Sequence, residues 1–330
     1  MRITDLARLG MLAARIVHPH TDHPPGNVVE ERDRTSRSGL AFDRYRPVSP
    51  TRRVVVAVHG VTVSGKDHPD LRHFARSLAA TGATCVTPTL PGLSEMLFAP
   101  SDVDALTALV EEVSRDHGRP VVLVGFCYGA SFALLAASRA GAAEAVHAVI
   151  SVGAYHDLAT VVEGYLEDPT PGDEAALDDR IYRDAVLAYR HRDHLGFDDR
   201  VATDLRDLLG RFCCQATGDE KRRFHERHLD GLDLLATDRL RLDPAALAEL
   251  SPAGKLAGIR CPVALLHDPV DRLVPVREAR RLHRELTALS DGARHRLLVT
   301  PLMSHVRLSA ATCLTDVAPL LRLLAPLVGD

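Results

Sequence analysis

The sequence predicts an α/β protein built on a mainly parallel, doubly wound sheet. Short apolar segments alternate with longer segments of helical periodicity, and this alternation is typical of parallel strands that are joined by helices. Several apolar segments contain almost no polar residue, as expected of strands that helices cover on both faces. Strands are expected near residues 53–58, 84–88, 120–125, 147–152, 261–267 and 295–300. Helices are expected near residues 69–81, 101–116, 130–140, 276–289 and 310–327.

The first 39 residues are predicted to form a helix and a polar linker ahead of this core. Apolar residues recur at helical spacing at Ile3, Leu6, Leu9, Ala13 and Ile16. We expect this helix to pack on the domain surface or across the mouth of the site. Dimerisation is the alternative, so the chain is expected to be a monomer or a homodimer. Residues 18–25 contain three histidines but are interpreted as a solvated connector, because no ligand pair lies on a rigid element. Residues 40–47 predict an edge strand.

Residues 156–250 show no strong strand signal, and charged helical segments dominate them. This region is predicted to be a helical insertion, while residues 40–155 and 251–330 form the α/β core. Residues 191–194 include two histidines, which are interpreted as a solvated face, because consecutive helical positions do not face one point. Cys213 and Cys214 are expected to pack inside the insertion rather than to form a redox pair.

The composition predicts a soluble, cytoplasmic protein, and no cofactor or metal ion is expected. The chain has 330 residues, 46% of them hydrophobic, and a formal net charge of −4, so no nucleic acid partner is expected. Six cysteines without framework spacing favour reduced thiols: Cys85, Cys127, Cys213, Cys214, Cys261 and Cys313. No apolar run approaches the ~20 residues of a membrane span, and the charged N-terminal segment is not typical of a signal peptide.

The segment Gly125-Phe126-Cys127-Tyr128-Gly129 carries the most chemical information in the chain. It stands between an apolar run at residues 121–124 and a helix-forming run at residues 130–139. Glycines two residues to either side of Cys127 allow the backbone to approach a strained turn residue without a Cβ clash. The pattern therefore indicates a sharp turn that displays Cys127. The structural alternative is that Cys127 is a buried, small apolar residue.

This strand, turn and helix pattern resembles the α/β-hydrolase superfamily, in the subset that uses cysteine as nucleophile, as in dienelactone hydrolases. The resemblance covers residues 40–155 and 250–330, and it implies an α/β-hydrolase fold in which residues 156–250 form a helical lid over the substrate. In this family the nucleophile precedes the acid, and the acid precedes the histidine. Asp271, in the loop after the strand at residues 261–267, is implied as the acid, with Asp268 as the competitor. His305, five residues past the last strand, is implied as the base.

The resemblance also implies an oxyanion hole, which is the pair of N–H groups that holds a developing negative charge. Residues 54–60 form an apolar strand that ends in His59-Gly60, so the N–H groups implied are those of Val61 and Tyr128. His59 is interpreted as a structural histidine that fixes the loop. Tyr155 and Asp157 follow the sixth strand and are candidates for lining the pocket, with Asp157 as a displaced acid in a further alternative.

The resemblance implies an enzyme that uses a Cys-His-Asp triad on an ester, lactone or thioester acyl group of a small molecule. A thiolate is a better leaving group than an alkoxide, which favours lactones, thioesters and acyl transfer over simple esters. One alternative is a lyase that eliminates an acyl group such as acetate from an O-acylated tetronate or polyketide intermediate. Another is an acyltransferase of specialised metabolism. A non-catalytic binding protein is the third.

Overall fold

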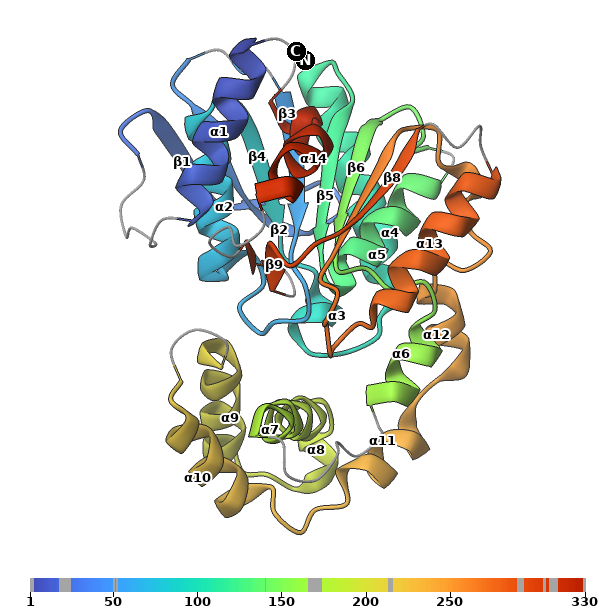
Figure 1. Ribbon diagram of the computed structural model, residues 1–330. Coiled ribbons are helices and arrows are strands. Elements are labelled where there is room, and N and C mark those ends of the chain that lie inside the picture. Colours follow the sequence, from blue (N-terminus) through green and yellow to red (C-terminus); the bar gives the residue numbers. More distant parts are fainter. Residues whose placement is uncertain are drawn as a thin grey trace.

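The computed structural model describes residues 3–17, 25–49, 51, 53–139, 141–165, 174–212, 216–289, 294–304, 307–308 and 314–328. An eight-stranded sheet forms its centre, with the strand order β1-β2-β4-β3-β5-β6-β7-β8. The neighbours from β4 through β3 to β8 are parallel, whereas β1 and β2 run antiparallel at one edge. The prediction of a mainly parallel, doubly wound sheet is confirmed (Figure 1).

The strands of this sheet are β1 (Val28–Thr35), β2 (Ala41–Pro47), β3 (Arg53–Val58), β4 (Ala83–Pro88), β5 (Val121–Phe126), β6 (Val146–Val152), β7 (Val263–His267) and β8 (His295–Val299). A separate antiparallel pair consists of β9 (Met303–Ser304) and β10 (Arg307–Leu308). The helices outside the insertion are α1 (Ile3–Val17), α2 (Pro69–Ala80), α3 (Pro91–Ser94), α4 (Pro100–His117), α5 (Tyr128–Ser138), α13 (Val276–Leu289) and α14 (Leu314–Leu324). Short 3-10 helices are η1 (Gly65–Asp67), η2 (Leu256–Gly258) and η3 (Ala325–Leu327).

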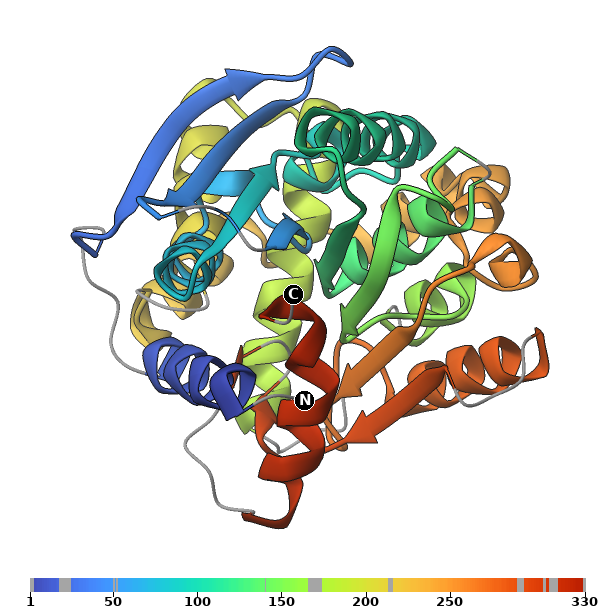
Figure 2. The same ribbon diagram turned by 90° about the horizontal axis from the view of Figure 1, so that it is seen from above.

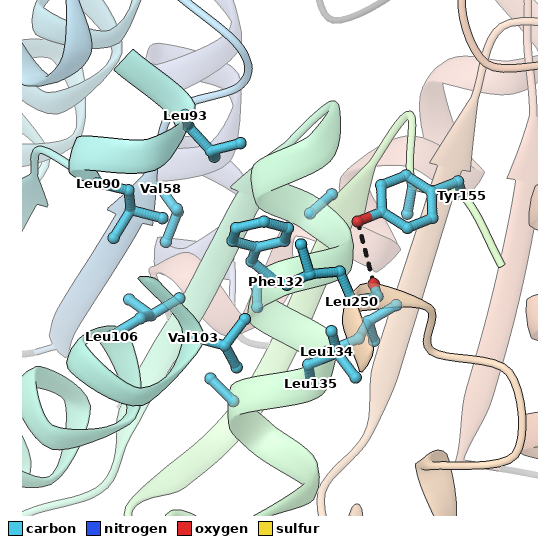
Figure 3. Close-up of a cluster of buried hydrophobic side chains, with 14 of the residues drawn as sticks. Val58, Leu90, Leu93, Val103, Leu106, Phe132, Leu134, Leu135, Tyr155 and Leu250 are labelled. Atoms are coloured by element: carbon cyan, nitrogen blue, oxygen red, sulfur yellow. Dashed lines mark hydrogen bonds between the residues drawn. The ribbon is translucent and has the colours of Figure 1, made fainter. Parts of the chain in front are cut away.

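Each central strand buries both of its faces, which explains its nearly continuous apolar sequence. In β3, Val54, Val56 and Val58 belong to one core cluster, whereas Val55 and Ala57 belong to the other. Helices α4 and α5 supply the first cluster, and α1, α2 and α14 supply the second. Figure 2 shows these two sets of helices on opposite sides of the sheet. The first cluster includes Phe132 and Leu134 of α5 together with Leu106 of α4 and Leu250 (Figure 3).

The N-terminal helix α1 packs on the core of its own chain. Leu9 and Leu12 are each 1% exposed, and they lie in the cluster that α2 and α14 share. This arrangement is the surface packing expected from the sequence.

The structure adds an edge strand, β1, that the sequence did not predict. It lies within residues 1–39, which were expected to hold only a helix and a linker, so the sheet begins before residue 40. The strand is rich in charge, and its pattern therefore does not resemble a core strand. Its pairing with β2 is reinforced by ion pairs, among them Arg32 with the fully buried Asp43 at 2.9 Å.

Between β6 and β7 the described residues form helices and no strand, as predicted. These inserted helices are α6 (Leu158–Tyr165), α7 (Glu174–Arg190), α8 (Arg192–Leu195), α9 (Asp199–Arg211), α10 (Gly218–His228), α11 (Leu234–Arg241) and α12 (Pro244–Leu250). In Figure 1, α7 to α10 lie below the sheet, on the side where α3 follows β4. Over the part of the chain that the structure describes, no helix is long and apolar enough to cross a membrane.

Candidate active site

Cys127 occupies a strained turn between β5 and α5. Its backbone has φ 52° and ψ −127°, and a residue other than glycine adopts a positive φ only when its surroundings enforce it. The N–H of Cys127 donates to the carbonyl of Val152 at 2.8 Å, and its own carbonyl accepts from the N–H of Ala130 at 2.9 Å. The turn is thus fixed by β6 on one side and by the first turn of α5 on the other.

The two flanking glycines are required by close backbone contacts. A Cβ on Gly125 would lie 2.4 Å from the Cα of Ala130, and a Cβ on Gly129 would lie 2.0 Å from the carbonyl oxygen of His59. Neither neighbour is a flexible side chain, so no larger residue fits without a backbone shift. The contact at Gly129 also brings the loop after β3 against the start of α5.

That loop passes directly beside the Cys127 thiol. A Cβ on Gly60 would lie 3.7 Å from Sγ of Cys127, and the next residue is Val61. Among the described residues, neither the N–H of Val61 nor that of Tyr128 donates a hydrogen bond to a backbone carbonyl. Tyr128 is the first residue of α5, where the helix leaves its N–H groups without internal acceptors. Two N–H groups of this kind, one in the residue after Gly60 and one in the residue after Cys127, suit the stabilisation of an oxyanion.

His59 holds the loop in place and is only 2% exposed. Its Nε2 accepts the N–H of Leu90 at 2.9 Å, so the ring proton lies on Nδ1, which donates to the carbonyl of Gly60 at 2.6 Å. Burial lowers the pKa of His59 to about 4. Since both ring nitrogens are engaged and the ring is neutral, His59 links the loops after β3 and β4.

Both candidate acids lie in the loop that follows β7. The Asp271 carboxyl is 1% exposed, and its Oδ1 accepts the N–H groups of Leu273 and Val274, each at 2.9 Å. Its Oδ2 lies 3.8 Å from Nε2 of His267. Asp268 closes a turn of its own, since its Oδ1 accepts the N–H of Val270 at 3.0 Å. Two backbone N–H groups thus hold one oxygen of the Asp271 carboxylate.

His305 lies outside the described residues. The backbone segments that flank it in sequence, β9 and β10, are paired, with Ser304 opposite Arg307. The segment that leads to His305 starts at Thr300, beside the carboxyl end of β7, because the N–H of Thr300 donates to the carbonyl of His267 at 3.0 Å.

Cys127 differs from the other described cysteines in its exposure. Cys85 and Cys261 are buried free thiols, whereas Cys127 is half-buried. Burial raises the pKa of Cys85 beyond the usual range of a thiol and that of Cys261 to about 11. Since the thiolate is the reactive form, these two positions are unreactive. Cys213, Cys214 and Cys313 lie outside the described residues, as do most of the histidine-containing residues 18–25.

The sequence matches the Alpha/beta hydrolase family over residues 55–309. The chain belongs to this family. The predictions of an α/β-hydrolase fold and of a hydrolase-class enzyme are thereby confirmed at the level of the family. Among the curated proteins, no sequence matches this α/β-hydrolase.

Two solved esterase structures show the same fold. An esterase from the bacterial hormone-sensitive lipase (HSL) family is 16% identical with a TM-score of 0.52, over 93% of this chain and 90% of that chain. Brefeldin A esterase, a bacterial homologue of human hormone sensitive lipase, is 19% identical with a TM-score of 0.50, over 98% of this chain and 81% of that chain. An acylaminoacyl peptidase is 14% identical with a TM-score of 0.49, over 91% of this chain and 40% of that chain. The α/β-hydrolase chain thus spans less than half of that peptidase.

Aromatic side chains lie beside the turn formed by Gly125 to Gly129, which we call the elbow of this α/β-hydrolase. The ring of Tyr128 stacks on Phe98, with 6.2 Å between centroids and 8° between planes, and it meets the edge of Tyr155 at 5.1 Å. Tyr155 is fully buried, and its hydroxyl donates to the carbonyl of Leu250 at 3.1 Å (Figure 3). Asp157 lies two residues after Tyr155 in the chain, just before α6, where its Oδ1 accepts the N–H of Ala159 at 3.0 Å. It lines a separate cavity of about 760 Å³ between α6 and α12.

A second group of residues near the elbow was not identified from the sequence. Arg190, the last residue of α7, lies over the ring of Phe98 at 4.4 Å and donates through Nε to the carbonyl of Met96 at 2.7 Å. Its Nη1 also donates to Oδ1 of Asp238 at 2.9 Å. Met96 has a positive φ of 58°, so this contact point is also strained. Residues 95–98 are therefore one place where the inserted helices reach the elbow.

The interpretation of residues 191–194 as a solvated face is wrong for His191. This side chain is 7% exposed, and its Nε2 lies 2.7 Å from Oδ1 of Asp238. The partner is 47 residues away in sequence, so helical periodicity did not reveal it. Across the described residues, no group of three His, Cys, Asp or Glu side chains is arranged to hold a metal ion.

Proposed function

We propose that this protein is an acyl hydrolase with Cys127 as nucleophile, His305 as general base and Asp271 as the acid that orients the imidazole. The observation that carries the proposal is the strained backbone of Cys127 at the strand-to-helix turn. A strained residue persists where the fold enforces it, and such residues concentrate at active sites. The half-buried thiol, at the first turn of α5 and beside the loop of Val61, supports the same assignment.

The reaction would proceed in two halves. In the first, His305 takes the thiol proton of Cys127, and the thiolate attacks the acyl carbonyl. The N–H groups of Val61 and Tyr128 hold the oxyanion of the tetrahedral intermediate. When the intermediate collapses, the bond to the alcohol or thiol breaks, and His305 protonates the leaving group. In the second half, His305 activates water, which attacks the thioester, and the acid product leaves as the thiol is restored.

The substrate class we propose is an ester, lactone or thioester of a small molecule. Residues 156–250 would act as a lid over the core formed by residues 40–155 and 251–330. The buried, free thiols of Cys85 and Cys261 support a cytoplasmic location. Asp271 is preferred over Asp268 as the acid because two backbone N–H groups fix its carboxylate.

Intact-protein mass spectrometry after brief incubation with p-nitrophenyl hexanoate tests the proposal. We expect a mass gain of one hexanoyl group on the native protein, and we expect Cys127→Ala to abolish both this gain and turnover. Cys85→Ala is the matched control, because it removes a thiol that is buried in β4, and it should retain the adduct. Turnover that survives in Cys127→Ala would refute the proposal. An alkyl acetate that carries an acidic β-hydrogen tests the elimination reaction, in which that C–H bond and the C–O bond to acetate both break; an alkene and acetate formed without an adduct on Cys127 would support elimination instead.

A further inference from the structure

The rings of Phe98 and Tyr128 stack beside Cys127 and form what we call the aromatic wall. Three polar groups without a complete set of partners lie along it, on Asp238, Tyr128 and Arg190. Asp238 is 1% exposed, and among the described residues its Oδ2 has no hydrogen-bond partner. The hydroxyl of Tyr128 and Nη2 of Arg190 make no hydrogen bond to any residue within the described ranges. Buried polar atoms in native proteins are nearly always paired, so an unpaired carboxylate oxygen at such depth calls for a partner beyond those that the described residues provide.

These groups belong to one location. Arg190 lies on the face of Phe98, and Tyr128 stacks on Phe98. Asp238 is joined to Arg190 through Oδ1, which also accepts from His191. Burial raises the pKa of Tyr128 above its usual range, the charges of Cys127 and Asp238 raise it further, and the charge of Arg190 lowers it. The charges of Arg190 and Asp238, both on inserted helices, therefore act on Tyr128, the residue after Cys127.

The charges of this location determine which ligand it accepts. Arg190 and Asp238 form an ion pair and compensate each other, so a charged ligand group would leave one buried charge without a partner. The open positions are one acceptor on Asp238 and one donor nitrogen on Arg190, with the phenol of Tyr128 able to serve as either. A neutral group that donates one hydrogen bond and accepts another matches this set. A secondary amide has this combination.

We propose that Tyr128, Arg190 and Asp238 form a subsite for a neutral polar group, such as a secondary amide, in the acyl part of the substrate. This assignment rests on the proposed function, because it takes the acyl chain to extend from Cys127 along the wall of Phe98 and Tyr128. The amide N–H would donate to Oδ2 of Asp238, and the amide carbonyl would accept from Nη2 of Arg190. A plain hydrocarbon chain would leave Oδ2 unpaired, and sites that read a hydrogen-bonding group discriminate strongly against analogues without it.

Two p-nitrophenyl esters of equal chain length test the subsite. The N-acetyl-β-alanyl ester carries an amide where the hexanoyl ester carries methylene groups. We expect the native enzyme to prefer the amide ester in kcat/KM by about tenfold or more. Asp238→Asn replaces the open acceptor by a donor and leaves Arg190 without its counter-charge. We expect this variant to lose most of the preference and to gain about tenfold for the anionic adipate monoester relative to the hexanoyl ester.

Asp184→Asn is the matched control. Asp184 is another buried carboxylate of the insertion, and it pairs with Arg183 and His225 rather than with the residues at the elbow. This variant should keep the native ratio. Tyr128→Phe removes only the phenol oxygen and should lower the ratio by about threefold to tenfold, which provides a second measurement if Asp238→Asn folds poorly.

The outcomes separate this inference from the proposed function. A native ratio near one, or an equal loss of the ratio in Asp184→Asn and Asp238→Asn, would overturn the subsite. If either result occurs while Cys127→Ala is inactive, the nucleophile assignment stands and only the subsite fails. If Cys127→Ala hydrolyses all three esters at the native rate, the proposed function itself fails.

Discussion

The strain at Cys127 has a measurable effect on stability that is independent of catalysis. Cys127→Gly relieves the positive φ of 52°, whereas Cys127→Ala removes the sulfur but keeps a Cβ in the same conformation. Backbone strain of this kind costs about 1–3 kcal/mol. Glycine loses about 0.5–1 kcal/mol through its greater freedom in the unfolded chain. The difference leaves Cys127→Gly more stable than Cys127→Ala by about 1 kcal/mol.

The size of this effect decides the assay. With an unfolding entropy of about 2.1 cal/mol/K per residue and 330 residues, 1 kcal/mol shifts the melting temperature by only about 1.5 °C. Equilibrium unfolding in urea is therefore the better measurement, with the two variants compared at a common denaturant concentration. Ala133→Gly, at a fully buried helical position of α5, is the control and should destabilise by about 1 kcal/mol or more. A Cys127→Gly protein less stable than Cys127→Ala would show that the turn stores no strain.

Two further predictions concern the loop beside the nucleophile. Gly129→Ala places a Cβ 2.0 Å from the His59 carbonyl and should destabilise the protein by about 2 kcal/mol or more, whereas Gly10→Ala, with no atom within 4 Å, should stabilise it by about 0.4–1 kcal/mol. Urea unfolding gives both values, and equal effects at the two positions would contradict the close contact. For His59 the folded pKa of about 4 lies below the ordinary 6.5, so its neutral form contributes stability at neutral pH that is lost as the pH falls from about 6.5 toward 4. Between pH 7 and 5 the native protein should therefore lose about 2 kcal/mol more than His59→Gln, and parallel pH curves would show that His59 is not held neutral.

Local sequence signals predicted the centre of this fold well. The strands β3 and β5 are apolar on both faces, and the glycines around Cys127 mark a turn whose geometry requires them. The edge strand β1 was missed because the contacts that stabilise it come from residues distant in sequence. Its charged residues are stabilised by partners on other strands and loops, such as Asp43 for Arg32, and no local pattern shows such a partner.

In the candidate site, too, residues in local motifs were predictable, whereas contacts between residues distant in sequence were not. Cys127 and Asp271 follow strands in recognisable loops, so their positions were predictable from the chain alone. The pair of Arg190 and Asp238 joins the end of α7 to the middle of α11, and the two residues are 48 apart in sequence. An arginine at the end of a charged helix is ordinary in sequence, and it becomes informative only when Phe98 and Met96 are seen beneath it.

The side chain of Glu95 gives the insertion a mechanical property. It accepts hydrogen bonds from Tyr189, Arg192 and Arg206, which come from α7, α8 and α9, and Arg206 also donates to the carbonyl of Val63 at 3.1 Å. If any one of these helices moved away, its tyrosine or arginine would lose the hydrogen bond to the Glu95 carboxylate. Glu95 thus gives α7, α8 and α9 one shared acceptor at the end of α3, beside the separate contacts that Arg190 makes with Met96 and Phe98.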